Sequence, residues 1–441
     1  MPLDDPGPHP ARRLRSILGG SAGNLVEWYD WYVYSAFSLY FARTVFPPAG
    51  QTAQLLSAAA VFAVGFFMRP LGGWLLGWYA DLRGRRAALT LSVLLMGGGS
   101  LLAALTPSYA AAGPLAPAML VGARLVQGLS VGGEYGASAT YLSEMAGARH
   151  RGFWSSFQYV TLILGQLAAL GVLIVLQQLL TPAALVAWGW RVPFVLGAAA
   201  AFAVRAVRRG LDETDDFQAV GAAGRARSPL ASLRALRAHP RAVATVVGLT
   251  AGGTVMFYTF TAYAQKYLVN TAGLTPAAAT RASALSLALF AAAQPAVGLV
   301  SDRVGRRPVL VAFGVLGTLA TVPLLTALGG ARTAAGAAGL LTVALLITSG
   351  YTAINAVVKA ELFPAAVRGI GVGFPYAVTV ALFGGTAEYL ALWARQAGRE
   401  GWYFWYVTAL VAGSLAVYVT MPETRDEGTM AGAVADPVTA G

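Results

Sequence analysis

Ionisable side chains stand inside several long apolar stretches of this 441-residue chain. Glu27 and Asp30 lie in one such stretch, and Arg69 and Arg124 lie in two others. A charge at mid-bilayer depth costs about 2.5–3.5 kcal/mol on insertion scales, so such a residue usually marks an ion or substrate pathway. A carboxylate can gain and lose a proton, whereas a guanidinium stays charged and can bind an anion. These residues therefore predict proton and anion chemistry inside a membrane.

Asp30 is the residue that we expect to carry the proton, because desolvation and a nearby arginine would act on it in opposite directions. Glu27 lies three residues earlier on the same helix face, and Glu134 is the second candidate for the carrier. The alternative for Asp30 is a permanent ion pair with an arginine that only ties two helices together.

Arg69 and Arg124 are candidates for binding a substrate carboxylate or for gating the proton carrier, and structural pairing is the alternative for Arg124. Gln127 follows Arg124 by three residues and shares its helix face. Gln158 is a neutral polar residue in another apolar stretch. It is a candidate for bonding the substrate, although hydrogen bonding between helices explains it equally well.

Lys266 and Lys359 are the two lysines among 31 basic residues, and both lie in apolar stretches. A compact ammonium fits a carboxylate pocket in which a broad guanidinium would be too large. We therefore expect both lysines to bind substrate, with Tyr258 lining the cavity near Lys266. The alternatives are that Lys266 snorkels to the outer interface and that Lys359 is simply a positive charge at the inner end of its helix.

The helices that must position these residues follow from composition. The chain is 57% hydrophobic and 11% charged, against roughly 25% charged in a typical soluble domain. Apolar runs of about 20 residues span a bilayer as helices. The sequence predicts an all-α membrane protein with twelve spans, at about 19–46, 54–80, 87–105, 119–143, 153–180, 190–207, 242–269, 278–300, 308–329, 335–360, 369–394 and 402–421.

The net charge of +12 comes from arginine clusters that follow the even-numbered spans, while the odd-numbered loops carry almost none. This asymmetry predicts that both termini are cytoplasmic. A nucleic-acid partner is not expected, because the cations form no single basic face. The chain has no cysteine, its three histidines lie in predicted loops or termini, and no nucleophile–base arrangement is visible. We expect no metal, no cofactor and no enzymatic activity.

A polar turn occurs twice. The stretch 77–86 (GWYADLRGRR) recurs at 298–307 (GLVSDRVGRR), with its glycines, its aspartate and both final arginines displaced by the same distance. A repeat at one offset indicates two related halves. The predicted plan is a cytoplasmic N-terminal segment (1–15), a six-helix bundle (16–207), a cytoplasmic linker (208–241), a second six-helix bundle (242–421) and a disordered cytoplasmic tail (422–441).

The duplicated turn resembles the cytoplasmic loop signature of the major facilitator superfamily. The stretches 23–28 (GNLVEW), 65–70 (GFFMRP) and 124–134 (RLVQGLSVGGE) resemble its metabolite:proton symporters. The stretches 257–260 (FYTF), 265–271 (QKYLVNT), 359–364 (KAELFP) and 383–389 (FGGTAEY) resemble, more narrowly, the alpha-ketoglutarate (2-oxoglutarate) permeases. The resemblance covers about residues 16–425.

This resemblance implies the twelve-helix major facilitator fold, alternating access and symport of protons with a dicarboxylate in a bacterial inner membrane. Citrate, shikimate and betaine-type osmolytes are the alternative substrates, and a membrane sensor that does not transport is a more distant alternative. A monomer is expected. The duplicated turns would then form a cytoplasmic gate with the opposite helix ends. The expected gate residues are Asp81, Arg85, Glu144, Arg151, Asp302, Arg306, Glu361 and Arg368.

Overall fold

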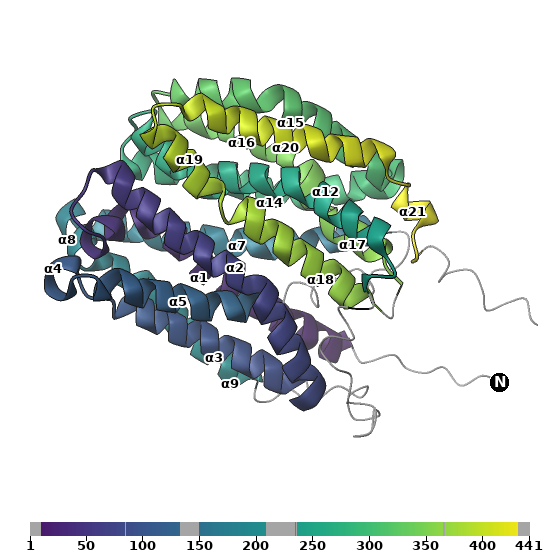
Figure 1. The fold of residues 1–441 in the computed structure, drawn as a ribbon, viewed down its shortest axis with the longest axis horizontal. Helices are drawn as coiled ribbons and strands as arrows, with labels where there is room; N and C mark the ends of the chain where they lie inside the picture. The colour runs from purple at the N-terminus through teal and green to yellow at the C-terminus, as the bar shows by residue number, and fades with distance from the viewer. Residues whose placement is uncertain are drawn as a thin grey trace, which may run out of the picture.

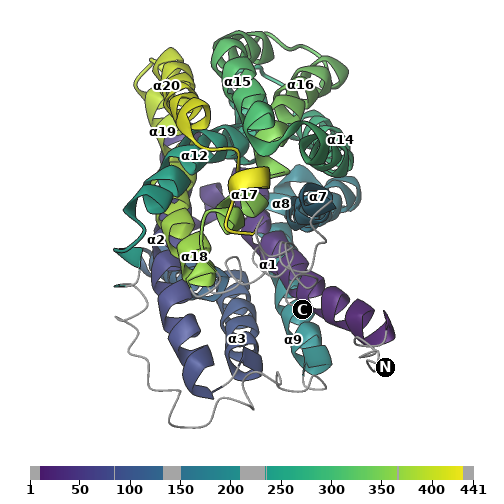
Figure 2. The ribbon, with the colours of Figure 1, turned by 90° about the vertical axis from the view of Figure 1, so that its right-hand side faces the viewer.

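A computed structural model describes residues 10–83, 85–132, 150–208, 234, 236–364 and 367–430. Within these ranges the chain is helical and contains no strand. The long helices lie side by side along one common direction (Figure 1). Helices from the first part of the sequence form one group, and helices from the last part form a second group that lies against it (Figures 1 and 2).

Among the described residues, the first group consists of six long helices and three short elements. The long helices are α1 (Pro10–Val45), α2 (Gln51–Arg83), α3 (Arg85–Ala104), α5 (Leu115–Gly132), α7 (Arg151–Leu179) and α9 (Val192–Arg208). The short elements are α4 (Tyr109–Ala112), α8 (Pro182–Ala187) and the 3₁₀ turn η2 (Gly189–Arg191).

In the second group, three of the predicted spans are interrupted. One consists of α12 (Pro240–Tyr258), the π-helical turn η4 (Thr259–Tyr263) and α13 (Ala264–Asn270). Another is divided into α16 (Ala334–Thr352) and α17 (Asn355–Glu361), and a third into α18 (Arg368–Thr379), the π-helical turn η5 (Val380–Gly384) and α19 (Ala387–Gln396). The uninterrupted helices are α14 (Pro276–Val304), α15 (Arg306–Gly329) and α20 (Glu400–Thr420).

Hydropathy identifies the bundle as a membrane protein. Within the described part of the chain, nine helices are long and apolar enough to cross a bilayer. Helix also occupies each of the twelve predicted ranges as far as those ranges are described. The predicted disorder of the tail is wrong for its first residues, because α21 (Thr424–Glu427) packs against the bundle with the side chain of Thr424 buried.

Glycines bring α2 and α5 into backbone contact. A Cβ atom at Gly128 would lie 2.1 Å from the carbonyl oxygen of Gly65, and one at Gly132 would lie 2.0 Å from that of Arg69. Any larger residue would force the two helices apart, as expected where small residues recur four apart on a membrane helix. This close packing places Arg69 of α2 and Arg124 of α5 at neighbouring positions in the core.

The two groups touch along the whole length of α7 and α14. We call the end at Gly152 and Asp302 the inner end, following the charge distribution, and the opposite end the outer end. At the inner end the backbone amide of Gly152 donates to Asp302 Oδ1 (2.7 Å). At the outer end Gln177 Nε2 donates to Thr280 Oγ1 (3.2 Å). Contacts between the groups therefore occur at both ends of the bundle.

Candidate functional site

Asp30 is fully buried at the centre of the first group. Its carboxylate accepts hydrogen bonds from Ser100 Oγ of α3 and from Gln127 Nε2 of α5. Gln127 Oε1 in turn accepts a hydrogen bond from Arg124 Nη1 (2.9 Å). Among the described residues, Asp30 therefore has neutral partners and reaches Arg124 through Gln127. The alternative of a direct, permanent Asp30–arginine ion pair does not describe this structure.

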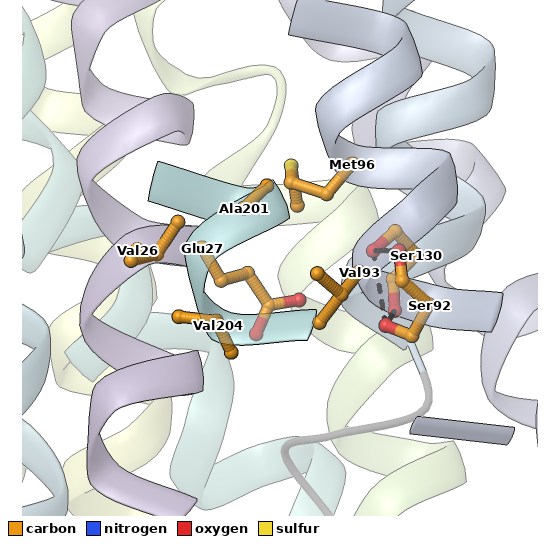
Figure 3. Close-up of a pocket in the computed structure, with 8 residues that line it drawn as sticks. All are labelled: Val26, Glu27, Ser92, Val93, Met96, Ser130, Ala201 and Val204. Carbon is orange, nitrogen blue, oxygen red and sulfur yellow. Dashed lines mark hydrogen bonds between the residues drawn. The ribbon is translucent and has the colours of Figure 1, made fainter. Parts of the chain in front are cut away.

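Glu27 lies on the same face of α1 as Asp30, one turn toward the inner end. Its side chain points into a small pocket between α1, α3, α5 and α9 (Figure 3). On the far wall of this pocket, Ser130 Oγ donates to the carbonyl oxygen of Ser92 (2.8 Å). Two carboxylates thus occupy the interior of the first group at successive turns of one helix.

Trp31 lies between two buried guanidinium groups. The guanidinium carbon of Arg69 lies 4.1 Å from the centroid of the Trp31 ring, and that of Arg124 lies 3.8 Å from it. The guanidinium carbon of Arg69 also lies 4.0 Å from the ring centroid of Phe66. That of Arg124 lies 4.6 Å from the ring centroid of Tyr34. A desolvated cation over an aromatic face gains roughly 2 kcal/mol, so these rings partly replace lost hydration.

Both guanidinium groups keep hydrogen-bonding capacity. Arg69 and Arg124 are 4% and 0% exposed. In the part of the chain that the structure describes, Nε and Nη2 of each have no hydrogen-bond partner. Buried donors that are left unsatisfied are costly, and a guanidinium matches a carboxylate in a bidentate pair. Two such groups around one aromatic ring are suited to bind an anion.

A cavity lies between the two groups of helices, and Arg69 forms part of its wall. The remaining wall comes from α1 and α5 on one side and from α18 and η5 on the other. The lining residues are Asn24, Glu27, Trp28, Arg69, Val131, Gly132, Gly373, Tyr376, Ala377 and Val380.

Two of the other expected substrate residues, Lys359 and Tyr258, lie near this cavity or near the aromatic residues around Arg69. Lys359 is fully buried, with Nζ 3.7 Å from the ring centroid of Tyr376, which lines the cavity. Lys359 is therefore enclosed by protein and is not a solvated charge. Tyr258 packs edge-on against Phe66 at a centroid distance of 5.2 Å. Gln158 is buried on α7.

Lys266 is fully buried and paired. Its Nζ lies 2.9 Å from Glu388 Oε2 and donates to Ser35 Oγ at 2.6 Å. The alternative that Lys266 snorkels to the outer interface is therefore wrong. Glu388 and Ser35 were not predicted as functional residues. An acid in an apolar segment was the available signal for Glu388, whereas Ser35 could not be distinguished from other small residues of α1.

At the inner end, Asp302 joins the two groups of helices. It accepts hydrogen bonds from the backbone amides of Gly152 (2.7 Å) and Phe153 (2.9 Å) and from Arg306 Nη1 (2.8 Å). Arg306 Nη2 lies 3.6 Å from Glu361 Oε1. The expected partners Asp302, Arg306 and Glu361 are thus brought together, but the first group contributes backbone amides to Asp302.

Two other arginines of the expected gate bind backbone carbonyls. Arg151 Nη2 donates to the carbonyl oxygen of Met430 (3.1 Å), and Arg368 Nε donates to those of Ala360 and Phe363. Glu134, Glu144 and the side chains of Asp81 and Arg85 lie outside the described residues.

Glu423 was not predicted as part of this end. Its carboxylate accepts from the backbone amides of Arg306 (2.8 Å) and Arg307 (3.0 Å) and so caps α15, where the helix dipole favours an anion. Among the described residues, no group of three or more histidine, cysteine, aspartate or glutamate side chains is arranged to hold a metal ion.

The sequence is similar to those of known transporters. A family model described as sugar (and other) transporter matches residues 17–235 and 223–431. The chain is 51% identical over 406 residues to the alpha-ketoglutarate permease of Escherichia coli (strain K12), covering 92% of this chain and 93% of that protein. It is 32% identical over 411 residues to the citrate-proton symporter of Klebsiella pneumoniae, covering 92% and 91%. It is 31% identical over 385 residues to the shikimate transporter of Escherichia coli (strain K12), covering 86% and 87%.

Solved structures share the architecture. The partially occluded inward open conformation of the xylose transporter XylE from E. coli superposes with a TM-score of 0.71 at 20% identity, covering 93% of this chain and 98% of that chain. A D-xylose-proton symporter gives a TM-score of 0.71 at 21% identity, covering 94% and 99%. At these identities the comparison establishes the fold, which is that of major facilitator transporters.

Proposed function

The chain belongs to the sugar (and other) transporter family, and from that premise we propose that it is a proton-coupled symporter that imports a dicarboxylate such as 2-oxoglutarate by alternating access. The observation that carries this proposal is the pair of buried guanidinium groups that pack on Trp31 and retain donors for an anion. Arg69, one of the two, lines the cavity between the two groups of helices. The bacterial alpha-ketoglutarate permease, 51% identical along most of the chain, supports the substrate class and an inner-membrane location.

The proposed architecture has twelve spans in two six-helix bundles, 16–207 and 242–421, joined by a cytoplasmic linker at 208–241. Both terminal segments, 1–15 and 422–441, would be cytoplasmic, and the protein would act as a monomer. The distribution of arginines and the two matches of the family model support this plan. Alternating access would rock one bundle against the other about a site near the midplane.

The substrate would bind with its carboxylates on arginine and lysine side chains. Arg69 supplies a cation in the wall of the cavity, and Arg124 supplies a second that packs on the same Trp31 ring. Lys266 supplies a third at the outer contact between the bundles. A dianion entering a region of low dielectric needs such fixed cations to offset its lost hydration. The proposed supporting residues, which would add hydrogen bonds or shape the cavity, are Gln127, Gln158, Tyr258 and Lys359.

Asp30 is the proposed proton carrier, and Glu27 and Glu134 are the other candidates. Asp30 is buried among neutral partners, and Gln127 connects it to Arg124. Binding of a carboxylate to Arg124 would change the electrostatic field that Arg124 exerts on Asp30. Anion binding at Arg124 would therefore alter the proton affinity of Asp30, and protonation of Asp30 would alter the anion affinity of Arg124. That relationship would couple proton binding to substrate binding.

The proposed cytoplasmic gate is the set of contacts at the inner end. Asp302, Arg306 and Glu361 would act with Arg151 and Arg368 to hold the two bundles together while the outer side is open. The remaining proposed members are Asp81, Arg85 and Glu144.

Citrate and shikimate are the second candidates, because transporters of both are more than 30% identical to this chain. Thermal unfolding of the purified protein with a panel of ligands separates the candidates. We expect 2-oxoglutarate to raise the unfolding temperature most, since binding stabilises the native state by RT ln(1 + [L]/Kd). Stabilisation by citrate or shikimate, with none by 2-oxoglutarate, would overturn the proposed substrate.

A further inference from the structure

Glu388 is a buried acid that the proposed function leaves without a role. It begins the second half of an interrupted span, on α19, and is 3% exposed. Its Oε2 lies 2.9 Å from Nζ of the fully buried Lys266. A buried ion pair is often no more stabilising than an apolar replacement of similar volume, because both charges lose their hydration. Stability alone therefore does not account for this pair.

The Lys266–Glu388 pair lies where the two bundles meet. Ser35 of α1 accepts a hydrogen bond from Lys266 Nζ (2.6 Å) and donates one to Glu388 Oε2 (3.2 Å). One turn earlier on α1, the hydroxyl of Tyr32 donates to the carbonyl oxygen of Thr261 in η4. Separation of the bundles at the outer end would remove this cover from α1 and expose Lys266 and Glu388.

The backbone positions both members of the pair in the same way. Lys266 follows the π-helical turn η4, and Glu388 follows the π-helical turn η5. Single π-helical turns inside α-helices occur frequently at functional sites. The segment after η5 also packs on the aromatic wall of the anion site, since a Cβ atom at Gly385 would lie 2.5 Å from Cβ of Phe66, the ring that faces Arg69. The pair is therefore adjacent to the proposed substrate site.

We propose that Glu388 is an internal counter-ion that holds Lys266 until a substrate carboxylate replaces it, so that the pair selects anions with two carboxylates. This inference rests on the proposed dicarboxylate transport and assigns a step of that transport to Glu388. With Lys266 on Glu388, the two charges cancel. A substrate carboxylate that takes Lys266 leaves Glu388 as an uncompensated buried anion, which is strongly unfavourable.

Protonation of Glu388 resolves this imbalance. One proton from the aqueous side adds to the Glu388 carboxylate, an O–H bond forms, and Lys266 keeps its own protons and its positive charge. The titratable groups that face Glu388 in the described residues are Lys266 of α13, Tyr32 and Tyr34 of α1 and Tyr403 of α20. Lys266 is the cation in this set. When Lys266 leaves Glu388 and pairs with the substrate carboxylate, Glu388 therefore binds a proton.

The first test measures how the affinity for 2-oxoglutarate depends on pH in the purified protein. Each proton taken up with the ligand changes the apparent dissociation constant by roughly tenfold per pH unit. We expect Glu388→Gln to take up one proton fewer with the ligand. Its apparent dissociation constant should therefore change by about tenfold less per pH unit than that of the wild type. Glu400→Gln is the matched control, because this acid of α20 pairs with Arg395 near the outer surface and should leave the slope unchanged. An unchanged slope in Glu388→Gln would overturn the inference.

The second test measures selectivity and remains informative where a single variant folds poorly. The double variant Lys266→Gln with Glu388→Gln keeps a hydrogen-bonding pair without either charge. We expect its affinity for 2-oxoglutarate to fall by about 100-fold, as for the loss of a charge-assisted hydrogen bond. Affinity for 2-oxopentanoate, which lacks the second carboxylate, should change less than about threefold, because that ligand never uses Lys266. Equal losses for both ligands would overturn the inference.

The two proposals fail separately. If the wild type neither binds nor transports any dicarboxylate, the proposed function is wrong. If the wild type transports 2-oxoglutarate and Glu388→Gln keeps the wild-type pH slope, the role of Glu388 alone is wrong.

Discussion

Asp30 and Arg124 are held one side chain apart, because Gln127 donates to the Asp30 carboxylate and accepts from Arg124 Nη1 at 2.9 Å. A direct ion pair between these residues would keep Asp30 charged and fix the two helices together. The amide between them leaves both groups in electrostatic contact while each remains able to change partner. This arrangement suits a carboxylate that exchanges protons and an arginine that exchanges anions.

Replacing Asp30 with asparagine should separate proton-driven uptake from exchange. The amide has nearly the same shape but cannot bind and release a proton in the physiological range. We expect accumulation of 2-oxoglutarate in proteoliposomes under an inward proton gradient to fall well below that of the wild type, because the proton on Asp30 is lost while the proposed proton on Glu388 remains. The rate of exchange of internal for external substrate should remain within about threefold of the wild type. The altered hydrogen bonds at this position change the free energy by about 0.7 kcal/mol, which corresponds to that factor. Asp426→Asn, at an exposed acid of α21, is the control. Accumulation by Asp30→Asn equal to that of the wild type would disprove the assignment.

Arg69 and Arg124 should each be needed for binding. Replacing either with glutamine removes a cation from the faces of Trp31 and a pair of donors from the anion site. Loss of one charge-assisted pair costs roughly 1.5–3 kcal/mol, so we expect the dissociation constant for 2-oxoglutarate to rise by about 10- to 150-fold. Isotope binding to the purified variants measures it. Wild-type affinity in both variants would contradict the proposed site, and Arg425→Gln on α21 serves as a control.

The close contact of α2 and α5 should determine stability. A Cβ atom at Gly132 would lie 2.0 Å from the carbonyl oxygen of Arg69, so Gly132→Ala must push the helices apart. We expect a loss of about 1–3 kcal/mol, as for overpacked cores, seen as a lower unfolding temperature in detergent. Gly122→Ala is the matched control on α5, since its nearest contact, a carbon of Leu102, is at an ordinary 3.8 Å. Equal unfolding temperatures for the two variants would show that the packing tolerates separation.

The inner-end contact of α7 and α14 should control which side of the protein is open. A Cβ atom at Gly152 would lie 2.4 Å from Ser301 Oγ and 2.7 Å from the carbonyl oxygen of Gly298. Gly152→Ala should therefore weaken the hydrogen bond to Asp302 and favour the state open to the cytoplasm. Because the chain has no cysteine, a single Ser155→Cys reporter, at a buried position of α7, can measure this.

In that reporter background, we expect Gly152→Ala to speed labelling by a soluble maleimide about tenfold, which corresponds to roughly 1.4 kcal/mol in the opening equilibrium. Gly171→Ala, at a position of α7 with open space around it, should leave the rate unchanged. Labelling of the Gly152→Ala variant at the reference rate would argue against the gate.

Much of this architecture could be predicted because a membrane helix must be apolar for about 20 residues, and that requirement is visible in the sequence. The same logic identified Asp30, Arg69 and Arg124, since charges inside such stretches are expensive. Their partners could not be predicted. Whether Gln127 separates Asp30 from Arg124, or Trp31 lies between two guanidinium groups, depends on packing between helices that are far apart in sequence.

Two features of the second bundle escaped prediction for related reasons. The π-helical turns η4 and η5 change the register of a helix without any helix-breaking residue at a fixed place, so the sequence carries little signal for them. Glu388 lies in a segment that resembles the 2-oxoglutarate permeases, yet its role depends on which cation it meets in space. The order in the tail at α21 was missed because composition predicts disorder, whereas contacts with the inner end stabilise it.

Uptake of radiolabelled 2-oxoglutarate into proteoliposomes containing the purified wild-type protein tests the central claim most directly. With an inward proton gradient, we expect accumulation above the external concentration, collapse of that accumulation when a protonophore is added, and competition by unlabelled 2-oxoglutarate. Uptake that only equilibrates with the outside and does not respond to the gradient would contradict it.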